Sequence, residues 1–151
     1  MAVKLLKKRP IGEYWLFLES WCFLAIARIL IFWIPFRKLL PLLGCQVSQE
    51  DAEMAASAPT ASNELLERIR ISILRASRRS PWRTKCFEQA LSVRMMLRRR
   101  NIKSVIYFGV SLNQPNQPEK MTAHAWLKCS GIVVTGGKNN GSFTVVGRFL
   151  V

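Results

Sequence analysis

The chain of 151 residues is long enough for one domain with a real hydrophobic core, and half of its residues are apolar, which excludes a disordered protein. It carries 23 Lys and Arg against 9 Asp and Glu, a formal net charge of +14. This excess indicates an anionic partner, such as a nucleic acid, a membrane surface or an acidic peptide. Because no known nucleic-acid-binding pattern accompanies the charge, a nucleic acid is not expected as a partner.

Residues 1–44 are expected to form apolar N-terminal helices. Their basic start resembles that of a signal peptide, but no small-residue cleavage site follows, so we expect a cytoplasmic protein with reduced thiols. The stretch 14–43 approaches the composition of a membrane span, yet Glu19 and Arg28 interrupt it. We expect this stretch to form helices that pack on the domain or on a partner, and Pro35 to end or kink the first of them. Membrane contact remains an alternative.

Residues 45–62 lose the large apolar side chains, which predicts a linker or loose loop before a core domain over residues 63–151. Apolar residues recur at helical spacing from the start of that domain, and this helix must stop before Pro81. A second helix is expected over about residues 85–100, with Thr84 as its N-cap.

The periodicity then changes to the alternation of β-strands. Turn residues separate four such segments, over residues 103–112, 121–129, 132–137 and 143–149. Helices followed by an antiparallel meander predict an α+β fold.

Cys86 falls at the start of the second helix, where free backbone N–H groups, the helix dipole and the neighbouring Arg83 and Lys85 all favour a thiolate. His124 is the only histidine and lies in a predicted strand, a rigid place for a base. Each residue alone is more often structural than catalytic, but a helix-start cysteine followed by a strand histidine favours a Cys–His pair.

The remaining cysteines do not indicate a metal site. The four cysteines of the chain are widely spaced, and one histidine cannot complete a zinc ligand set with them at finger-like spacing. We therefore expect neither a metal nor another cofactor.

Three segments carry a resemblance to a known family: SPWRTKCFEQALSVRMMLRRRNIKSVIYFGV, TAHAWLKCSGIVVTGG and FTVVGRF. Together they resemble the B protein of lasso-peptide biosynthesis in its stand-alone protease form, a transglutaminase-like cysteine protease. The apolar N-terminus and PFRKLLPLLG (35–44) resemble this family more loosely, so the resemblance covers nearly the whole chain.

The resemblance implies a papain/transglutaminase-like core, in which the nucleophile-bearing helix packs on a four-stranded antiparallel sheet. It implies a leader peptidase that acts on a ribosomally synthesised lasso-peptide precursor, with Cys86 as nucleophile and His124 as base. It also implies two protein partners, a separate leader-binding protein and a macrolactam-forming cyclase.

The sequence departs from the family at the third catalytic position, which is typically an Asp on the strand after the histidine. Gly136 and Gly137 stand there, and no carboxylate follows Glu119. The imidazole could instead be oriented by Asn139 or Asn140, or by a local backbone carbonyl.

Trp82 and Trp126 could contact substrate or partner, or pack against the Cys–His pair and limit its contact with water. Ordinary core packing is the alternative.

Two other functions stay open. An amine could replace water on the same acyl-enzyme, which would make the protein an acyltransferase. A non-catalytic basic module could instead dock on a membrane surface or an acidic partner.

Overall fold

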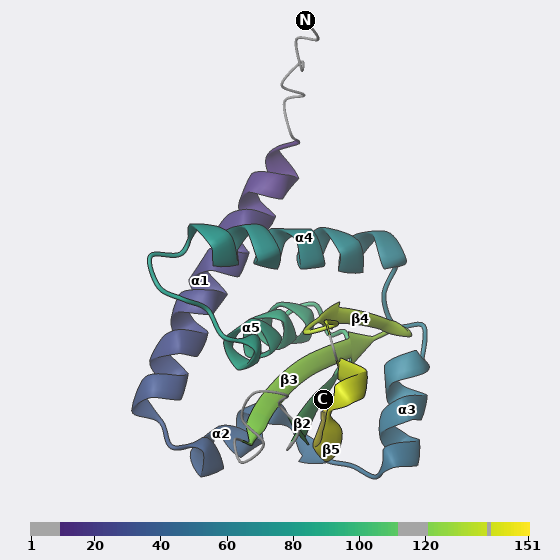
Figure 1. The fold of residues 1–151 in the computed structure, drawn as a ribbon. Helices are drawn as coiled ribbons and strands as arrows, with labels where there is room; N and C mark the ends of the chain where they lie inside the picture. Colours follow the sequence, from purple (N-terminus) through teal and green to yellow (C-terminus); the bar gives the residue numbers. More distant parts are fainter. Residues whose placement is uncertain (1–9, 112–120, 139) are drawn as a thin grey trace, which may run out of the picture.

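The computed structural model describes residues 10–111, 121–138 and 140–151 (Figure 1). Its helices are α1 (Ile11–Trp33), α2 (Phe36–Leu43), α3 (Gln49–Ser57), α4 (Asn63–Arg79) and α5 (Cys86–Arg98). Its strands are β1 (Cys45–Gln46), β2 (Val105–Ser111), β3 (Thr122–Cys129), β4 (Ile132–Thr135) and β5 (Thr144–Leu150), with a short 3₁₀ helix, η1 (Asn140–Ser142), before β5. The strands form one antiparallel sheet in the order β1-β5-β2-β3-β4, which confirms the predicted α+β class.

The two faces of the sheet belong to different hydrophobic clusters, because successive side chains of a strand point to opposite faces. Ala125, Leu127 and Ile106 pack in a cluster with α1, α4 and α5. Tyr107 and Trp126 pack in a second cluster with α3. Helix α5 therefore lies between the sheet and the α1–α4 pair (Figure 1).

The helix boundaries follow local signals in the sequence. The Ser62 hydroxyl caps α4 by accepting a hydrogen bond from the backbone N–H of Leu65, and α4 ends before Pro81 as predicted. Asn101 follows α5 with φ +55°, the left-handed conformation that commonly terminates helices. The cap of α5 differs from the prediction: Lys85 is its N-cap and makes no side-chain capping bond.

The segment 45–62 is not a loose linker, because it contains β1 and α3. Helix α3 buries only the small side chains Ala52 and Ala56, one turn apart, so a search for large apolar residues misses it. Strand β1 adds a fifth strand to the four predicted, pairing Cys45 with Leu150 at the sheet edge. Two residues are too few to produce a detectable alternation.

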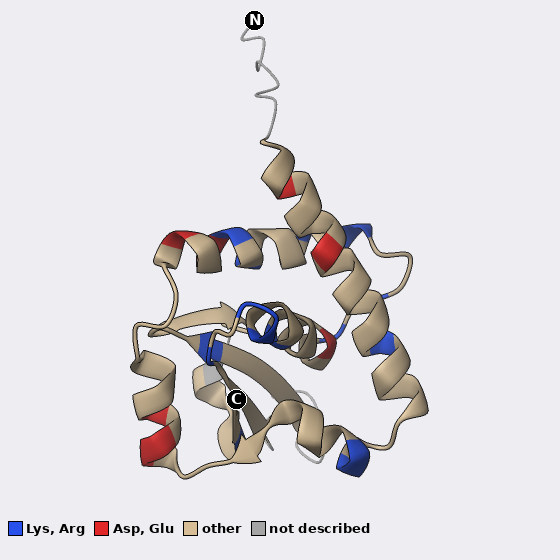
Figure 2. Ribbon diagram, turned by 180° about the vertical axis from the view of Figure 1, so that it is seen from behind, with Lys and Arg blue, Asp and Glu red and all other residues tan. Residues whose placement is uncertain are grey.

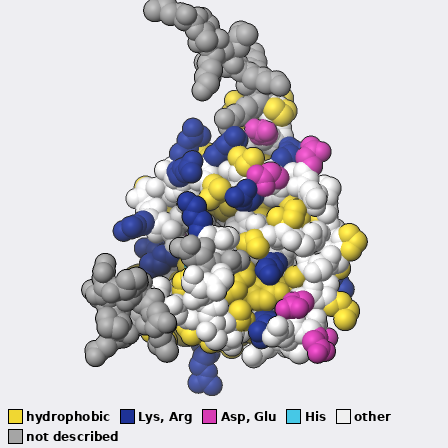
Figure 3. Space-filling model, turned by 45° about the vertical axis from the view of Figure 1, so that its right-hand side comes forward, with side chains coloured by type: hydrophobic (Ala, Val, Ile, Leu, Met, Phe, Trp, Pro, Cys, Tyr) yellow, Lys and Arg dark blue, Asp and Glu magenta, His cyan; other side chains and the backbone are white. Residues whose placement is uncertain are grey.

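Helix α1 ends at Trp33, two residues before Pro35, as predicted. Among the described residues, it is the helix that is long and apolar enough to cross a membrane by length and composition. One side of α1 packs on α4 and α5. Figure 3 shows Lys and Arg side chains spread over the face seen there, with acidic side chains toward its right-hand margin.

Candidate active site

Cys86 is the first residue of α5 and is half-buried. Because Lys85 makes no side-chain capping bond, the N–H groups of the first turn are not taken up by a cap. Such N–H groups bind anions, and the positive end of the helix dipole adds to this. The position suits an oxyanion bound next to Cys86.

The Cys86 side chain opens into a cavity of about 560 Å³ that His124 also lines. Its walls come from α2, α5 and strands β1, β2, β3 and β5, and they are mostly apolar. Four phenylalanines form a connected ring cluster there, with neighbouring centroids 5.2 to 5.9 Å apart: Phe36, Phe87, Phe108 and Phe149. The structure thus brings both predicted residues to one largely apolar cavity.

His124 lies on β3, and its Nε2 atom is 2.8 Å from the carbonyl oxygen of Gly136. A carbonyl oxygen only accepts hydrogen bonds, so Nε2 must carry the proton in this contact. The neutral ring then has its lone pair on Nδ1, which is the atom available to act as a base. Trp126 and Phe143 flank the ring, with centroid distances of 5.9 and 5.0 Å, and hold its orientation.

The Cys86 thiol and the His124 ring pack with side chains on opposite faces of the sheet. Cys86 packs against the cluster on the α5 side of the sheet, whereas His124 shares its strand face with Trp126, which packs toward α3. In the described part of the chain no hydrogen bond joins the thiol to the imidazole; the ring bonds to Gly136 instead. The structure therefore places the candidate nucleophile and the candidate base at one cavity without pairing them.

The candidates for orienting the His124 ring were two asparagine side chains and a backbone carbonyl, and the structure describes only the carbonyl. Asn139 lies outside the described residues, and Asn140 begins η1 with a side chain that is likewise not described. The backbone alternative considered from the sequence is present as the Gly136 carbonyl. Gly136 has φ +71°, a conformation that favours glycine and turns this carbonyl toward β3.

The two candidate tryptophans lie in different places. Trp126 is 4% exposed, stacks on Tyr107 at 5.6 Å and contacts the His124 ring. Trp82 packs on Trp21 of α1 at 5.9 Å, and its buried indole nitrogen has no hydrogen-bond partner among the described residues. Trp126 therefore contacts the His124 ring directly, whereas Trp82 joins the α4–α5 connection to α1.

The other cysteines do not line the cavity. Cys22 and Cys45 are exposed, and buried Cys129 lies 3.3 Å from the carbonyl oxygen of Lys103. Across residues 10–111, 121–138 and 140–151, no group of three or more His, Cys, Asp or Glu is arranged to hold a metal ion.

Two ion-pair groups tie α1 to α5, and the sequence did not reveal them. Glu88, in the first turn of α5, is almost fully buried and accepts a 2.7 Å hydrogen bond from Arg28 of α1. At the other end of α5, Arg99 and Arg100 both pair with Glu19. The two α1 charges that seemed to disfavour a membrane span thus anchor α1 to the two ends of α5.

Comparison with known proteins agrees with this architecture. The family model described as Transglutaminase-like superfamily matches residues 30–148. The matched region begins within α1 and includes β1 and α3. No curated protein and no solved structure matches the chain.

Proposed function

Because the chain belongs to the transglutaminase-like superfamily, whose fold is that of papain-like cysteine proteases and acyltransferases, we propose that it is a cytoplasmic leader peptidase. Its substrate is a ribosomally synthesised lasso-peptide precursor. The observation that carries the chemistry is that Cys86, at the N-terminus of α5, and His124 line one cavity. The resemblance of the Pro-Trp-x-x-x-Cys and Ala-His-Ala-Trp blocks to lasso-peptide B proteins supports the choice of substrate.

In the first half of the reaction, the Cys86 thiolate attacks the carbonyl carbon of the scissile amide. N–H groups in the first turn of α5 bind the resulting oxyanion. His124 holds the thiol proton on Nδ1 and gives it to the amine as the C–N bond breaks. The leader remains attached to Cys86 as a thioester, and the core peptide leaves.

In the second half, water attacks the thioester carbonyl while His124 accepts one of its protons. The proton returns to the sulfur as the C–S bond breaks, which releases the leader as a carboxylic acid. Both halves need the thiol and the ring within hydrogen-bond reach. Catalytic hydrogen bonds commonly tighten only when substrate is bound, and in this proposal the Cys86–His124 bond forms when the precursor binds.

Two partners complete the proposal. A separate leader-binding protein delivers the precursor, and a macrolactam-forming cyclase uses the released core peptide. Neither partner changes the chemistry assigned to Cys86 and His124.

The test is cleavage of a precursor peptide by the purified protein with its leader-binding partner, followed by mass spectrometry. We expect Cys86→Ala to abolish cleavage while the protein stays folded. Cys22→Ala and Cys45→Ala are matched controls, because both thiols are exposed and neither residue lines the cavity, and Cys129→Ala tests the buried thiol. Cleavage by the Cys86 variant would disprove the proposal.

Acyl transfer is the second candidate, and the apolar cavity favours it, since four phenylalanines around Cys86 limit access of water to a thioester. The same assay with an added primary amine separates the two reactions. A leader amide in place of the free acid would identify a transferase.

A further inference from the structure

Helix α1 has two apolar faces, of which only the inner one is covered. The inner face packs on α4 and α5, with Leu16, Leu24 and Ala27 buried. Large apolar side chains on the outer face are 42% to 77% exposed, among them Trp15, Leu18, Ile26, Ile29, Phe32 and Trp33. An uncovered apolar face of this length marks an interaction surface.

The charges of α1 do not interrupt its outer face. Glu13, Glu19 and Arg28 are the charged residues of this helix (Figure 2), and all three form ion pairs with residues of α4, of α5 or directly after α5. A helix bound to the domain along one side cannot be surrounded by lipid as a spanning helix is. It can lie parallel to a bilayer surface with its uncovered outer face toward the lipid.

Aromatic side chains occupy both ends of the outer face. Tyr14 and Trp15 stand near the N-terminus of α1, and Phe32 and Trp33 stand at its C-terminus. Aromatic rings of this kind prefer the boundary between lipid headgroups and acyl chains.

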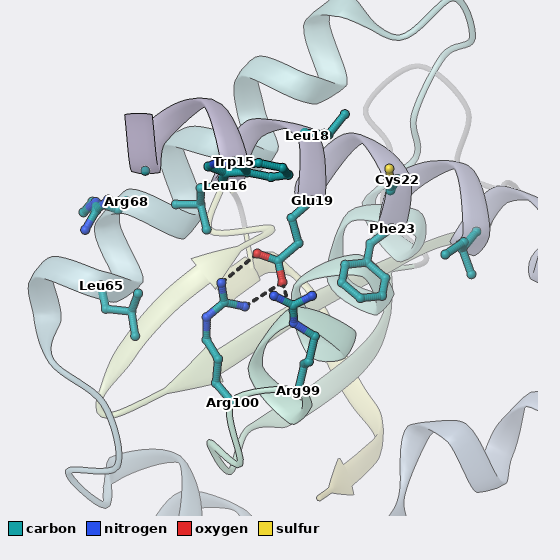
Figure 4. A pocket seen from close by; sticks show the side chains of 12 residues that line it. Trp15, Leu16, Leu18, Glu19, Cys22, Phe23, Leu65, Arg68, Arg99 and Arg100 are labelled. Carbon is teal, nitrogen blue, oxygen red and sulfur yellow. Dashed lines mark hydrogen bonds and ion pairs between the residues drawn. The ribbon is translucent and has the colours of Figure 1, made fainter. Parts of the chain in front are cut away.

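Cations border the same face. A groove of about 570 Å³ runs beside α1, with Trp15 on one wall and Arg68, Arg99 and Arg100 on the other (Figure 4). Glu19 pairs with the last two arginines and so neutralises one charge, which leaves the groove positive. At the other end of α1, the first turn of α2 exposes a second basic pair, Arg37 and Lys38.

We propose that the outer face of α1 docks on an anionic phospholipid bilayer. Its aromatic and aliphatic side chains enter the headgroup–acyl boundary, while the arginine-lined groove and the basic turn of α2 contact lipid phosphates. A second copy of this chain is a poorer occupant, because two surfaces with the same excess of arginine and a net charge of +14 each repel one another. Docking of this kind is independent of the proposed peptidase activity.

The test is sedimentation of the full chain with vesicles of phosphatidylcholine alone or of phosphatidylcholine with phosphatidylglycerol. We expect binding to the anionic vesicles, weakened by salt, with a blue shift of tryptophan emission as Trp15 and Trp33 leave water. Alkaline carbonate should release the bound protein, since α1 does not span the bilayer.

Two pairs of variants separate the apolar and charged contributions. Trp15→Ser combined with Trp33→Ser should lower the partition coefficient between water and anionic vesicles at least about tenfold. Met54→Ser, at an exposed position of α3, should not lower it. Arg68→Gln should lower it about fivefold. Arg70→Gln is the matched charge control, because Arg70 points away from the groove and pairs with Glu67.

Three results would overturn the proposal. These are absence of binding to anionic vesicles, equal binding to neutral ones, or a concentration-dependent dimer that the double tryptophan variant abolishes. Folding of each variant is checked by its thermal denaturation midpoint, and exposed positions should leave that midpoint unchanged.

Discussion

The Nε2 atom of His124 lies 2.8 Å from the carbonyl oxygen of Gly136, so a backbone group holds the imidazole where related enzymes are expected to use a carboxylate. A carbonyl fixes the tautomer and the ring orientation as well as a carboxylate does. It stabilises a developing imidazolium less, because it carries only a partial charge. A thiol needs less help from its base than a serine hydroxyl needs, so this weaker partner can suffice.

Gly136→Ala should therefore impair both folding and activity. A Cβ at this position would lie 2.5 Å from the Ala125 carbonyl oxygen and 2.8 Å from the Trp126 Cβ, and φ +71° is unfavourable for alanine. We expect a loss of about 2 kcal/mol in unfolding free energy or more, and a cleavage rate at least about tenfold lower. Gly137→Ala is the matched control: its Cβ would make only ordinary contacts at 3.5 Å, so both quantities should barely change.

Asn139→Ala and Asn140→Ala should each reduce the cleavage rate by less than about a hundredfold. The reason is that the ring already has an acceptor in the Gly136 carbonyl. Loss of the carboxylate from a serine-type triad costs about ten-thousandfold, and a loss of that size in either variant would show that an amide side chain is a required member of the site.

The rate at which iodoacetamide alkylates Cys86 without substrate should depend little on His124. Since no hydrogen bond joins the two side chains in the described structure, we expect His124→Ala to change this rate less than about threefold. The measurement needs Cys22 and Cys45 replaced by alanine, because both thiols are exposed. A drop of tenfold or more would mean that the pair is already formed in the free enzyme.

The ion pair between Arg28 and Glu88 should contribute to stability. The Glu88 side chain is 2% exposed, so Arg28→Met would leave a buried carboxylate without its cation. Arg28 is itself partly exposed, and we therefore expect a loss of only about 1 to 3 kcal/mol by chemical denaturation, less than for a fully buried pair.

A second variant and a control identify the cause of that loss. Glu88→Gln added to Arg28→Met should recover part of the stability, since the unpaired charge is gone. Arg75→Met, which removes a looser 3.4 Å pair with Glu13 between partly exposed side chains, should cost less than about 1 kcal/mol. Equal losses for both arginines would refute a special role for Glu88.

Local sequence signals were sufficient to predict the elements that bury large side chains. Helix α4 shows apolar residues at helical spacing and stops before Pro81, and β2 is rich in the β-branched and aromatic residues that favour strands. Helix α3 escaped prediction because its buried face consists of Ala52 and Ala56, whose small side chains give little periodic signal. Strand β1 exists only through its pairing with β5, which is a long-range contact.

The candidate site divides in the same way. Cys86 and His124 could be chosen from residue type, local structure and motif, and both line the cavity. From the sequence, the Gly136 carbonyl could be considered only as one of several possible acceptors for the His124 ring. The residue type does not say in which direction its carbonyl oxygen points. The pairing of Arg28 with Glu88 joins residues 60 positions apart and depends wholly on how α1 packs on α5.

Arg94 of α5 is 1% exposed and should be a site where a substitution stabilises the protein. Its Nε donates a 3.1 Å hydrogen bond to the Leu42 carbonyl, but its two terminal nitrogens have no partner among the described residues. Burial, and secondarily the charge of Arg98, lowers the pKa of Arg94 to about 10, so the side chain is still charged at neutral pH and carries an uncompensated desolvation cost.

Arg94→Met keeps most of the volume, removes the charge and gives up the bond to Leu42. Replacing buried ionic groups by apolar ones of similar size gains about 1 to 4 kcal/mol, and the lost bond subtracts about 1, so we expect a net gain of about 1 to 2 kcal/mol. Urea denaturation of Arg94→Met beside Arg98→Met, an exposed arginine one turn later that should have little effect, provides the comparison. A destabilised Arg94 variant would show that the guanidinium has a stabilising partner beyond Leu42.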